Sequence, residues 1–326
     1  MSWEFVVAGL FVGTLVGMTG MGGGSLLTPI LVLLLGFNPT VAIGTDIAHG
    51  AIFKTVGAVR HRFMGNVAAR LSGWMLLGSA PASVLGVLTI TWLQRRYGDD
   101  VESVASQILG AALIFGCVGL AAKTLLRAKA VPDRPLRLSN RDRIAAVVIG
   151  IVGGFVVGLT SVGTGVFFGL TLLILFPLGA HKVVGTDIFH AAALLYVAGF
   201  SHFVAGNVDL GAVGWLLIGS IPGVLIGSQL TLSLPERLLR GVLAAVLGLA
   251  GLRLLEVPGT TVAIVVVIGV GMLALLLYIG RRRMPWWNWW TTTRFYKPEP
   301  LTAEQPPSES LAPGAGGERD VVVPRL

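Results

Sequence analysis

Long runs of apolar residues alternate with short polar connectors along most of this chain. Seven runs are continuous and close to or above the roughly 20 residues that a helix needs to cross a bilayer. They cover residues 41–59, 71–93, 105–127, 183–205, 210–234, 237–255 and 259–280. The pattern predicts seven transmembrane helices and an all-α fold.

Two further apolar regions, 4–36 and 143–178, are interrupted by segments rich in Gly, Ser and Thr at 17–25 and 158–165. A half of about 14 residues extends only about 20 Å, short of a hydrocarbon core of about 30 Å. We therefore expect a re-entrant pair of half-helices in each region, and the sequence leaves two tilted spans as the alternative.

The second part of the chain repeats the first. A shift of 141 residues aligns 44–86 with 185–227 without a gap and gives 18 identities in 43 positions. Apolar composition can produce matches of Gly, Ala, Val and Leu, but it does not align pairs of Asp, His, Asn, Trp and Pro. The same shift superposes the two glycine-rich breaks. The chain is therefore a duplication in which each half has a broken region followed by three spans.

Basic residues indicate how the halves are oriented. The connector 128–143 holds five Lys and Arg residues, and Arg60, Arg62 and Arg70 lie around the connector between the first two spans. The connector 200–210, which is equivalent to this second one, has no Lys or Arg. Because Lys and Arg mark cytoplasmic loops, the second half is expected to be inverted relative to the first. The predicted fold is an all-α polytopic membrane protein of two inverted-topology repeats, each with a re-entrant pair and three transmembrane helices, plus one extra C-terminal transmembrane helix.

This topology divides the chain into five parts and places its C-terminus in the cytoplasm. They are a first repeat (1–127), a basic cytoplasmic linker (128–142), a second repeat (143–255), an additional transmembrane helix (256–283), and an interfacial Trp segment with a disordered cytoplasmic tail (284–326). We expect the protein in the cell inner membrane. The sequence leaves open whether it forms a homo-oligomer.

Composition agrees with a membrane location. Residues of the AVILMFWYC set make up 54% and charged residues 12%, about half the share usual in soluble proteins. The net charge of +8 resides largely in connectors, so nucleic acid is not an expected partner. The single cysteine, Cys117, allows no internal disulfide or CxxC metal site. With no Walker A, GxSxG or HExxH pattern, we expect neither an enzyme nor a cofactor.

The two breaks offer chemistry suited to an anion. A helix that begins after a Gly-rich turn presents unpaired N–H groups and its positive dipole end, and hydroxyl side chains add donors. The alternative is that these glycines only permit close helix packing. Our candidate substrate-binding residues are Thr19, Gly20, Gly22, Gly23, Gly24, Ser25, Thr160, Ser161, Gly163, Thr164, Gly165 and Lys54.

Two Asp–His pairs, Asp46 with His49 and Asp187 with His190, share a helix face because they are spaced by three residues. Three interpretations remain open. The pairs carry protons; or each Asp caps a helix start while each His bonds a backbone carbonyl; or all four converge on a metal ion. Lys54 is expected to pair with an Asp or to hold the anion.

These residues resemble a known family. Gly17-x-x-Gly20-x-Gly22-Gly23-Gly24 with Pro29, Ala42-x-Gly44-Thr45-Asp46, Lys54, His61, Gly65-Asn66-Val67 and Gly78-Ser79-x-Pro81 are similar to the TauE/SafE sulfite exporter family, also called the 4-toluenesulfonate uptake permease family. The resemblance covers residues 5–255. It implies transport of sulfite, thiosulfate, sulfonates or related small anions. The second half departs from the first where Leu195 replaces Lys54.

The sequence thus predicts a secondary transporter of small sulfur-containing anions, an exporter working by alternating access, with proton coupling as an option. Its partners are the anion and the lipid bilayer. Two rivals remain: a passive anion channel, and a divalent-metal transporter that uses the Asp/His tetrad.

Overall fold

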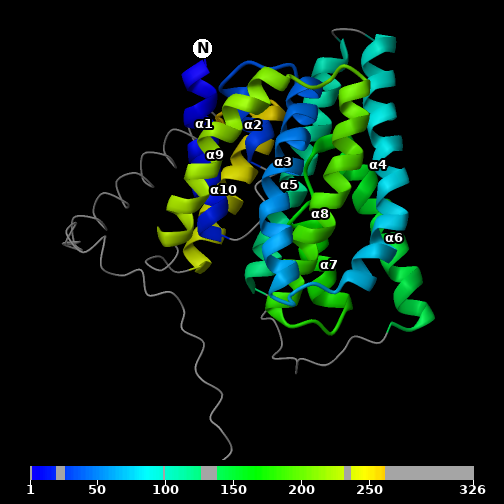
Figure 1. Ribbon diagram of the computed structural model, residues 1–326. Coiled ribbons are helices and arrows are strands. Elements are labelled where there is room, and N and C mark those ends of the chain that lie inside the picture. Colours follow the sequence, from blue (N-terminus) through cyan, green and yellow to red (C-terminus); the bar gives the residue numbers. More distant parts are fainter. Residues whose placement is uncertain (1, 20–25, 98–99, 126–137, 231–235, 261–326) are drawn as a thin grey trace, which may run out of the picture. The chain divides into compact units, whose positions relative to one another are not determined.

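Ten helices make up the part of the chain that the computed structural model describes, residues 2–19, 26–97, 100–125, 138–230 and 236–260 (Figure 1). They are α1 (Ser2–Thr19), α2 (Leu27–Leu33), α3 (Pro39–Phe63), α4 (Ala69–Tyr97), α5 (Asp100–Leu125), α6 (Asn140–Thr160), α7 (Phe167–Leu175), α8 (Ala180–Val204), α9 (Leu210–Leu230) and α10 (Glu236–Leu254). These ranges contain no strand, which confirms the all-α class.

The predicted spans up to residue 255 agree with observed helices within a few residues. Among the helices of the described ranges, five are long and apolar enough to cross a membrane: α4, α5, α6, α8 and α9. Helix α3 has 25 residues but is less apolar because it carries buried polar groups such as Asp46, His49 and Lys54. The run 259–280, most of the linker 128–142, and the Trp segment with its tail lie outside the described residues.

The two broken regions have unequal arms, contrary to the expected half-helices of similar length. Helices α1 and α6 contain 18 and 21 residues, whereas α2 and α7 contain only seven and nine. At 1.5 Å per residue α6 extends roughly 31 Å, so it is not too short to span. It begins early because Ser139 and Asp142 form a capping box, with Ser139 Oγ accepting from the Asp142 N–H at 3.2 Å.

Glycines let two pairs of helices touch backbone to backbone. A Cβ added at Gly13 of α1 would collide with the carbonyl oxygen of Ser220 in α9. In the same way, a Cβ at Gly154 of α6 would collide with the carbonyl oxygen of Ser79 in α4. These two contacts are related by the shift of 141 residues. Small residues are typical where membrane helices approach this closely.

Contacts between distant residues establish the helix directions. Thr45 and His49 of α3 bond Asp209 and Ser220, at and after the start of α9, so α3 and α9 are parallel. Gly13 and Gly9 of α1 meet Ser220 and Leu216, so α1 is parallel to both. The equivalent contacts show that α6 and α8 are both parallel to α4.

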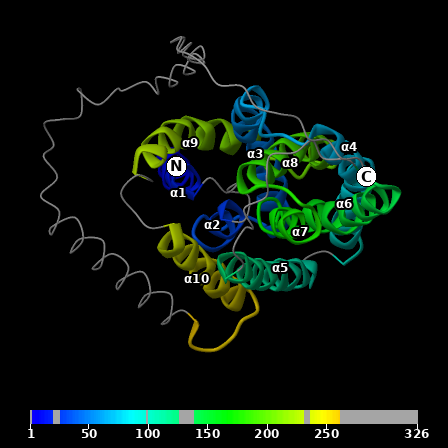
Figure 2. The same cartoon turned by 90° about the horizontal axis from the view of Figure 1, so that it is seen from below.

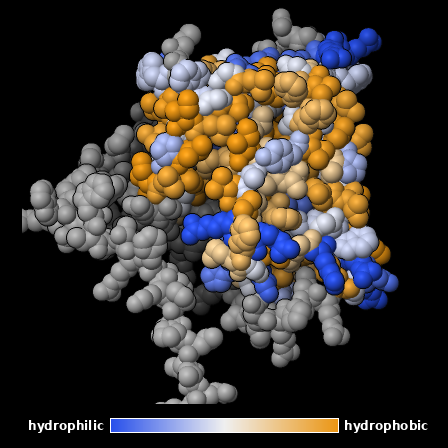
Figure 3. All heavy atoms as spheres, in the orientation of Figure 1, coloured by the Kyte–Doolittle hydropathy of each residue, from blue (hydrophilic) through white to orange (hydrophobic). Residues whose placement is uncertain are grey.

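Helices α3 and α8 form the middle of the described bundle. Seen along the helices in Figure 2, they lie between the α1–α9 pair and the α4–α6 pair, while α5 lies beside α10. Figure 3 shows apolar side chains across the middle of one face, with strongly hydrophilic residues gathered near its upper and lower edges. Such a belt is the surface that a lipid bilayer requires.

Candidate functional site

The site centres on α3 and α8, which cross in opposite directions. Asn38 caps α3, its Oδ1 accepting from the Thr40 N–H at 3.0 Å, and Pro39 occupies the first turn, where a missing N–H costs nothing. Asp46 therefore lies two turns inside the helix. The cap of α8 is Gly179, with no side-chain bond. The interpretation of Asp46 and Asp187 as helix caps is wrong, because both helices begin seven residues or so before them.

Asp46 joins the two halves of the chain. Its Oδ2 accepts hydrogen bonds from Thr28 Oγ1 of α2 at 2.5 Å and from Ser161 Oγ at 2.9 Å. Ser161 belongs to the second break and adopts a left-handed conformation, with φ of 61°. Asp46 is almost completely buried, so these hydroxyl donors replace the water that its carboxylate loses.

Lys54 and Asp187 hold the same break from its other end. Lys54 Nζ donates to Thr164 Oγ1 at 2.6 Å, and the Gly165 N–H donates to Asp187 Oδ1 at 3.3 Å. Lys54 is buried and interacts electrostatically with Asp187 and with Asp46. The predicted candidates Ser161, Thr164, Gly165, Lys54, Asp46 and Asp187 thus surround one turn of irregular backbone.

The remaining candidates of this break have local roles. Thr160 Oγ1 donates to the Val156 carbonyl at 2.7 Å and accepts from the Val162 N–H at 3.2 Å. Its hydroxyl therefore satisfies backbone groups at the C-terminal end of α6. Gly163 has φ of 129°, a backbone conformation that side chains disfavour. Of the first break, the Thr19 side chain and Gly20, Gly22, Gly23, Gly24 and Ser25 lie outside the described residues.

Each histidine of the Asp–His pairs bonds a serine from the other half. His49 Nε2 lies 2.9 Å from Ser220 Oγ of α9, and His190 Nε2 lies 2.9 Å from Ser79 Oγ of α4. The two bonds are equivalent under the 141-residue shift. Sequence reasoning missed both serines as partners, although their alignment within Gly-Ser-x-Pro was a usable signal.

The two aspartates and two histidines of the Asp–His pairs do not converge on a metal ion. Gly57 of α3 faces Ile188 of α8, so Asp187 lies near the level of residue 57, roughly 16 Å along the axis from Asp46. Within the described ranges, no three His, Cys, Asp or Glu side chains form a cluster suited to a metal ion. The tetrad interpretation fails because α3 and α8 are antiparallel, which puts the two pairs at different depths.

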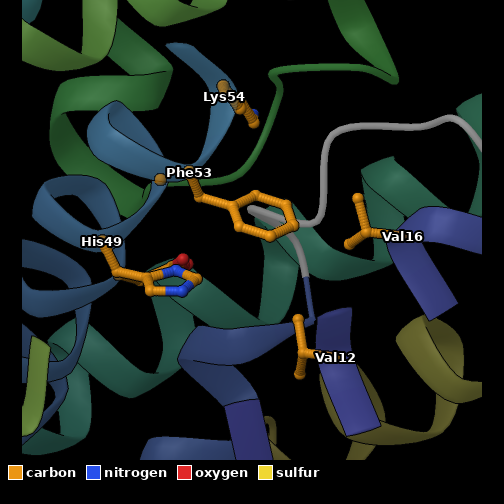
Figure 4. Close-up of a pocket in the computed structure, with 7 residues that line it drawn as sticks. Val12, Val16, His49, Phe53 and Lys54 are labelled. Atoms are coloured by element: carbon orange, nitrogen blue, oxygen red, sulfur yellow. The ribbon is translucent and has the colours of Figure 1, made fainter. Parts of the chain in front are cut away.

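A small pocket lies beside the first Asp–His pair, between α1 and α3 (Figure 4). His49 and Phe53 extend from α3 toward Val12 and Val16 of α1. The lining residues are Val12, Val16, Asp46, His49, Gly50, Phe53 and Lys54. The cavity is small, about 10 Å³, which is room for about one water molecule. Apolar walls with a few convergent polar groups are typical of ligand sites.

His202 of α8 is fully buried. Its Nε2 lies 2.9 Å from the carbonyl oxygen of Gly158, at the end of α6. Asn207, in the connection after α8, donates from Nδ2 to Thr91 Oγ1 of α4 at 2.9 Å. These bonds tie the α8–α9 connection to α6 and α4.

This arrangement of apolar helices around a polar centre at a helix break defines a multi-pass α-helical membrane protein. Residues 5–254 match the profile of the family described as Sulfite exporter TauE/SafE, and the chain belongs to that family. The resemblance noted in the sequence is thereby confirmed over nearly the whole described region.

Several curated proteins are similar to the chain. The Probable membrane transporter protein YjnA of Bacillus subtilis is 38% identical over 78% of this chain and 100% of its own length. The Probable membrane transporter protein YdhB of the same organism is 26% identical over 74% of this chain and 96% of its own. An Undecaprenyl-diphosphatase of Anaeromyxobacter dehalogenans is 31% identical, but over only 43% of this chain and 50% of its own. No solved structure matches.

Proposed function

We propose that this protein is a secondary transporter that exports small sulfur-containing anions, such as sulfite or organosulfonates, by alternating access. One observation carries the proposal: the buried ammonium of Lys54 bonds Thr164 at the helix break, beside a pocket. A lysine is costly inside a membrane unless it serves a charged ligand or a partner. Membership of the TauE/SafE family and relatives named as membrane transporters support transport over enzymatic chemistry.

We propose further that the two halves form inverted-topology repeats. In support, residue i of one half meets residue j of the other, and the equivalent of j meets the equivalent of i: Gly44 approaches Asn207, and Gly185 approaches Asn66. Reciprocal contacts of this kind are those of a twofold relation. The equivalent helices α3 and α8 are also antiparallel. Broken helices in inverted repeats are a feature of secondary transporters, with the substrate held between the repeats.

The anion in this scheme displaces Thr164 from Lys54 and takes donors from the break at 161–165 and from its equivalent at 20–24. Asp46, His49, Asp187 and His190 are the candidates for proton coupling, because a carboxylate or imidazole that gains a proton as the anion binds and loses it as the anion leaves keeps the net charge of the site constant. In the proposed topology the protein lies in the inner membrane, the linker 128–142 is cytoplasmic, and the C-terminus is on the same side.

Thermal stability of the detergent-purified full chain tests the binding step. The panel contains sulfite, thiosulfate, sulfate, methanesulfonate, chloride and Zn²⁺. A ligand at 100 times its Kd stabilises the folded state by about 2.7 kcal/mol, which raises the melting temperature. We expect a rise with sulfite or methanesulfonate that is lost in Lys54→Gln and kept in Lys182→Gln, a control at the start of α8 away from the site.

Flux into proteoliposomes tests the transport step. A transporter coupled to a proton gradient concentrates the labelled anion against its own gradient, and Lys54→Gln abolishes this accumulation. Movement that only ever follows the anion gradient, with single-channel currents, would establish the channel instead. Stabilisation by Zn²⁺ alone would overturn the anion proposal.

A further inference from the structure

The duplicated surroundings of His49 and His190 contain different side chains. Three positions decide the contrast, each compared with its equivalent 141 residues later. Val12 corresponds to Gly153, Leu27 to Phe168, and Lys54 to Leu195. The equivalence holds in space as well as in sequence, because Gly9 meets Leu216 as Gly150 meets Met75.

In the second half, Phe168 occupies the space that corresponds to the pocket. Its ring centroid is 4.4 Å from that of His190, and Phe168 has no exposed surface. The ring fits because residue 153 is a glycine: a Cβ there would lie 2.5 Å from Phe168 Cζ and 2.6 Å from Phe167 Cε1. The valine at the equivalent position 12 lines the open pocket. Gly153 and Phe168 are complementary: Phe168 is larger than its equivalent Leu27, and it fills the space that is free because Gly153 lacks the side chain of its equivalent Val12.

Polar groups of the second copy are correspondingly reduced. His190 Nδ1 is buried and has no hydrogen-bond partner among the described residues, next to an aromatic ring that offers no polar atom. Leu195 supplies no charge where Lys54 does. The hydroxyls that bond Asp46, those of Thr28 and Ser161, correspond to Gly169 and Gly20, which have no side chain. Among the described residues, the side-chain hydroxyls therefore gather around Asp46, and Lys54 lines the pocket there while also reaching Thr164 beside Asp187.

We infer that the chain carries one working copy of its duplicated site. One small anion binds in the pocket beside His49 and Lys54, while Phe168 closes the equivalent space beside His190 and makes that copy structural. The anion in this statement rests on the proposed function, whereas the difference in access between the two copies does not. A single cation in the pocket matches a ligand of small net charge, since Asp46 adds a negative charge nearby.

Thiol accessibility at an equivalent pair of positions tests the inference. Phe53, at the pocket, corresponds to Leu194, which has no exposed surface. In the full chain with Cys117→Ala, Phe53→Cys and Leu194→Cys are treated with a small permeant reagent, methyl methanethiosulfonate. We expect Phe53→Cys to react at least tenfold faster. Adding Phe168→Ala is expected to bring Leu194→Cys to within about threefold of Phe53→Cys, and adding Leu27→Ala is the matched control that leaves Leu194→Cys slow.

The outcomes separate this inference from the proposed function. Equal rates for the two cysteines, or a Leu194→Cys rate that Phe168→Ala leaves unchanged, would overturn the closed second copy. Protection of Phe53→Cys by sulfite or methanesulfonate tests the anion. If the rates differ as expected but no anion protects, the proposed function fails while the difference between the copies stands.

Discussion

Lys54 places a charge in the middle of a helix bundle, and its observed hydrogen-bond partner is the neutral hydroxyl of Thr164. Hydrogen bonds to charged groups contribute roughly 1.5–3 kcal/mol each, so this one matters for both stability and ligand binding. It is also the contact that an anion would replace. A single substitution at this contact is therefore the simplest way to weaken the substrate site without changing the fold.

Thr164→Val keeps the volume and shape of the side chain but removes its hydroxyl. We expect the melting temperature to fall by a few degrees, because the ammonium of Lys54 loses its partner. The stabilisation by anion is expected to increase, since the ligand no longer competes with Thr164. Thr171→Val is the control, because Thr171 Oγ1 bonds carbonyls of its own helix at 2.9 and 3.0 Å. An unchanged anion response in Thr164→Val would show that the ligand does not displace this hydroxyl.

The two histidines are expected to respond differently to the same substitution. His49→Gln alters the pocket and is expected to lower anion affinity by tenfold or more at nearly unchanged melting temperature. His190→Gln places an amide against Phe168 and is expected to lower the melting temperature while anion affinity changes less than threefold. Titration of each purified variant with the stabilising anion measures both quantities. Equal losses of affinity would contradict a difference in role between the copies.

Single-residue reasoning identified the polar positions of the site but not their neighbours. Asp46, His49 and Lys54 were recognisable as costly groups in apolar runs. Their partners are Ser220 of α9, Thr164 of the second break and Thr28 of the preceding helix α2, and no periodicity within one helix reveals which face of another element it meets. Phe168 was invisible for the same reason, since one more Phe in an apolar run carries no local signal.

At the scale of elements, close backbone contact makes some glycines irreplaceable and leaves others free. Gly154 of α6 abuts the Ser79 carbonyl, whereas a Cβ at Gly73 of α4 would have nothing within 4 Å. Gly154→Ala is expected to lower the melting temperature markedly, because α4 and α6 must separate. Gly73→Ala is the matched control and is expected to be neutral or stabilising, since Ala favours helix by up to about 1 kcal/mol.

The equivalent glycine substitution can be tested in the α1–α9 pair. Gly13→Ala in α1 should match Gly154→Ala, because it collides with Ser220 in the equivalent way. If either variant melts like Gly73→Ala, the helices are able to move apart without loss, and close packing there contributes little.

Element boundaries were predictable to within a few residues where apolar runs ended at charged or turn residues. The breaks were less predictable. Glycine-rich sequence located the interruption near 158–165, and the irregular turn falls at Ser161–Val166. The capping box at Ser139 extended α6 into the polar connector, which a hydropathy pattern does not detect because it registers only apolar length.

At the scale of the whole molecule, the helix directions give a topology that labelling can test. Gly36, between α2 and α3, and Gly179, between α7 and α8, are equivalent connections in the two halves. In the Cys117→Ala background, an impermeant thiol reagent applied to intact cells is expected to label Gly36→Cys from outside. Gly179→Cys is expected to react only in inside-out vesicles. Labelling of both from the same side would overturn the inverted arrangement.

The pairing of α1 with α9 has a consequence for biogenesis. Ribosomes make chains from the N-terminus at about 5–20 residues per second, so roughly 10–40 s separate the synthesis of α1 from that of α9. During this interval the glycine face of α1 has no native partner, while α4 and α6 are already able to meet. A nascent chain must therefore hold its first helix in lipid, or against the insertion machinery, until α9 has been made. A first half expressed by itself would keep that face exposed, and co-expression with the second half should rescue it.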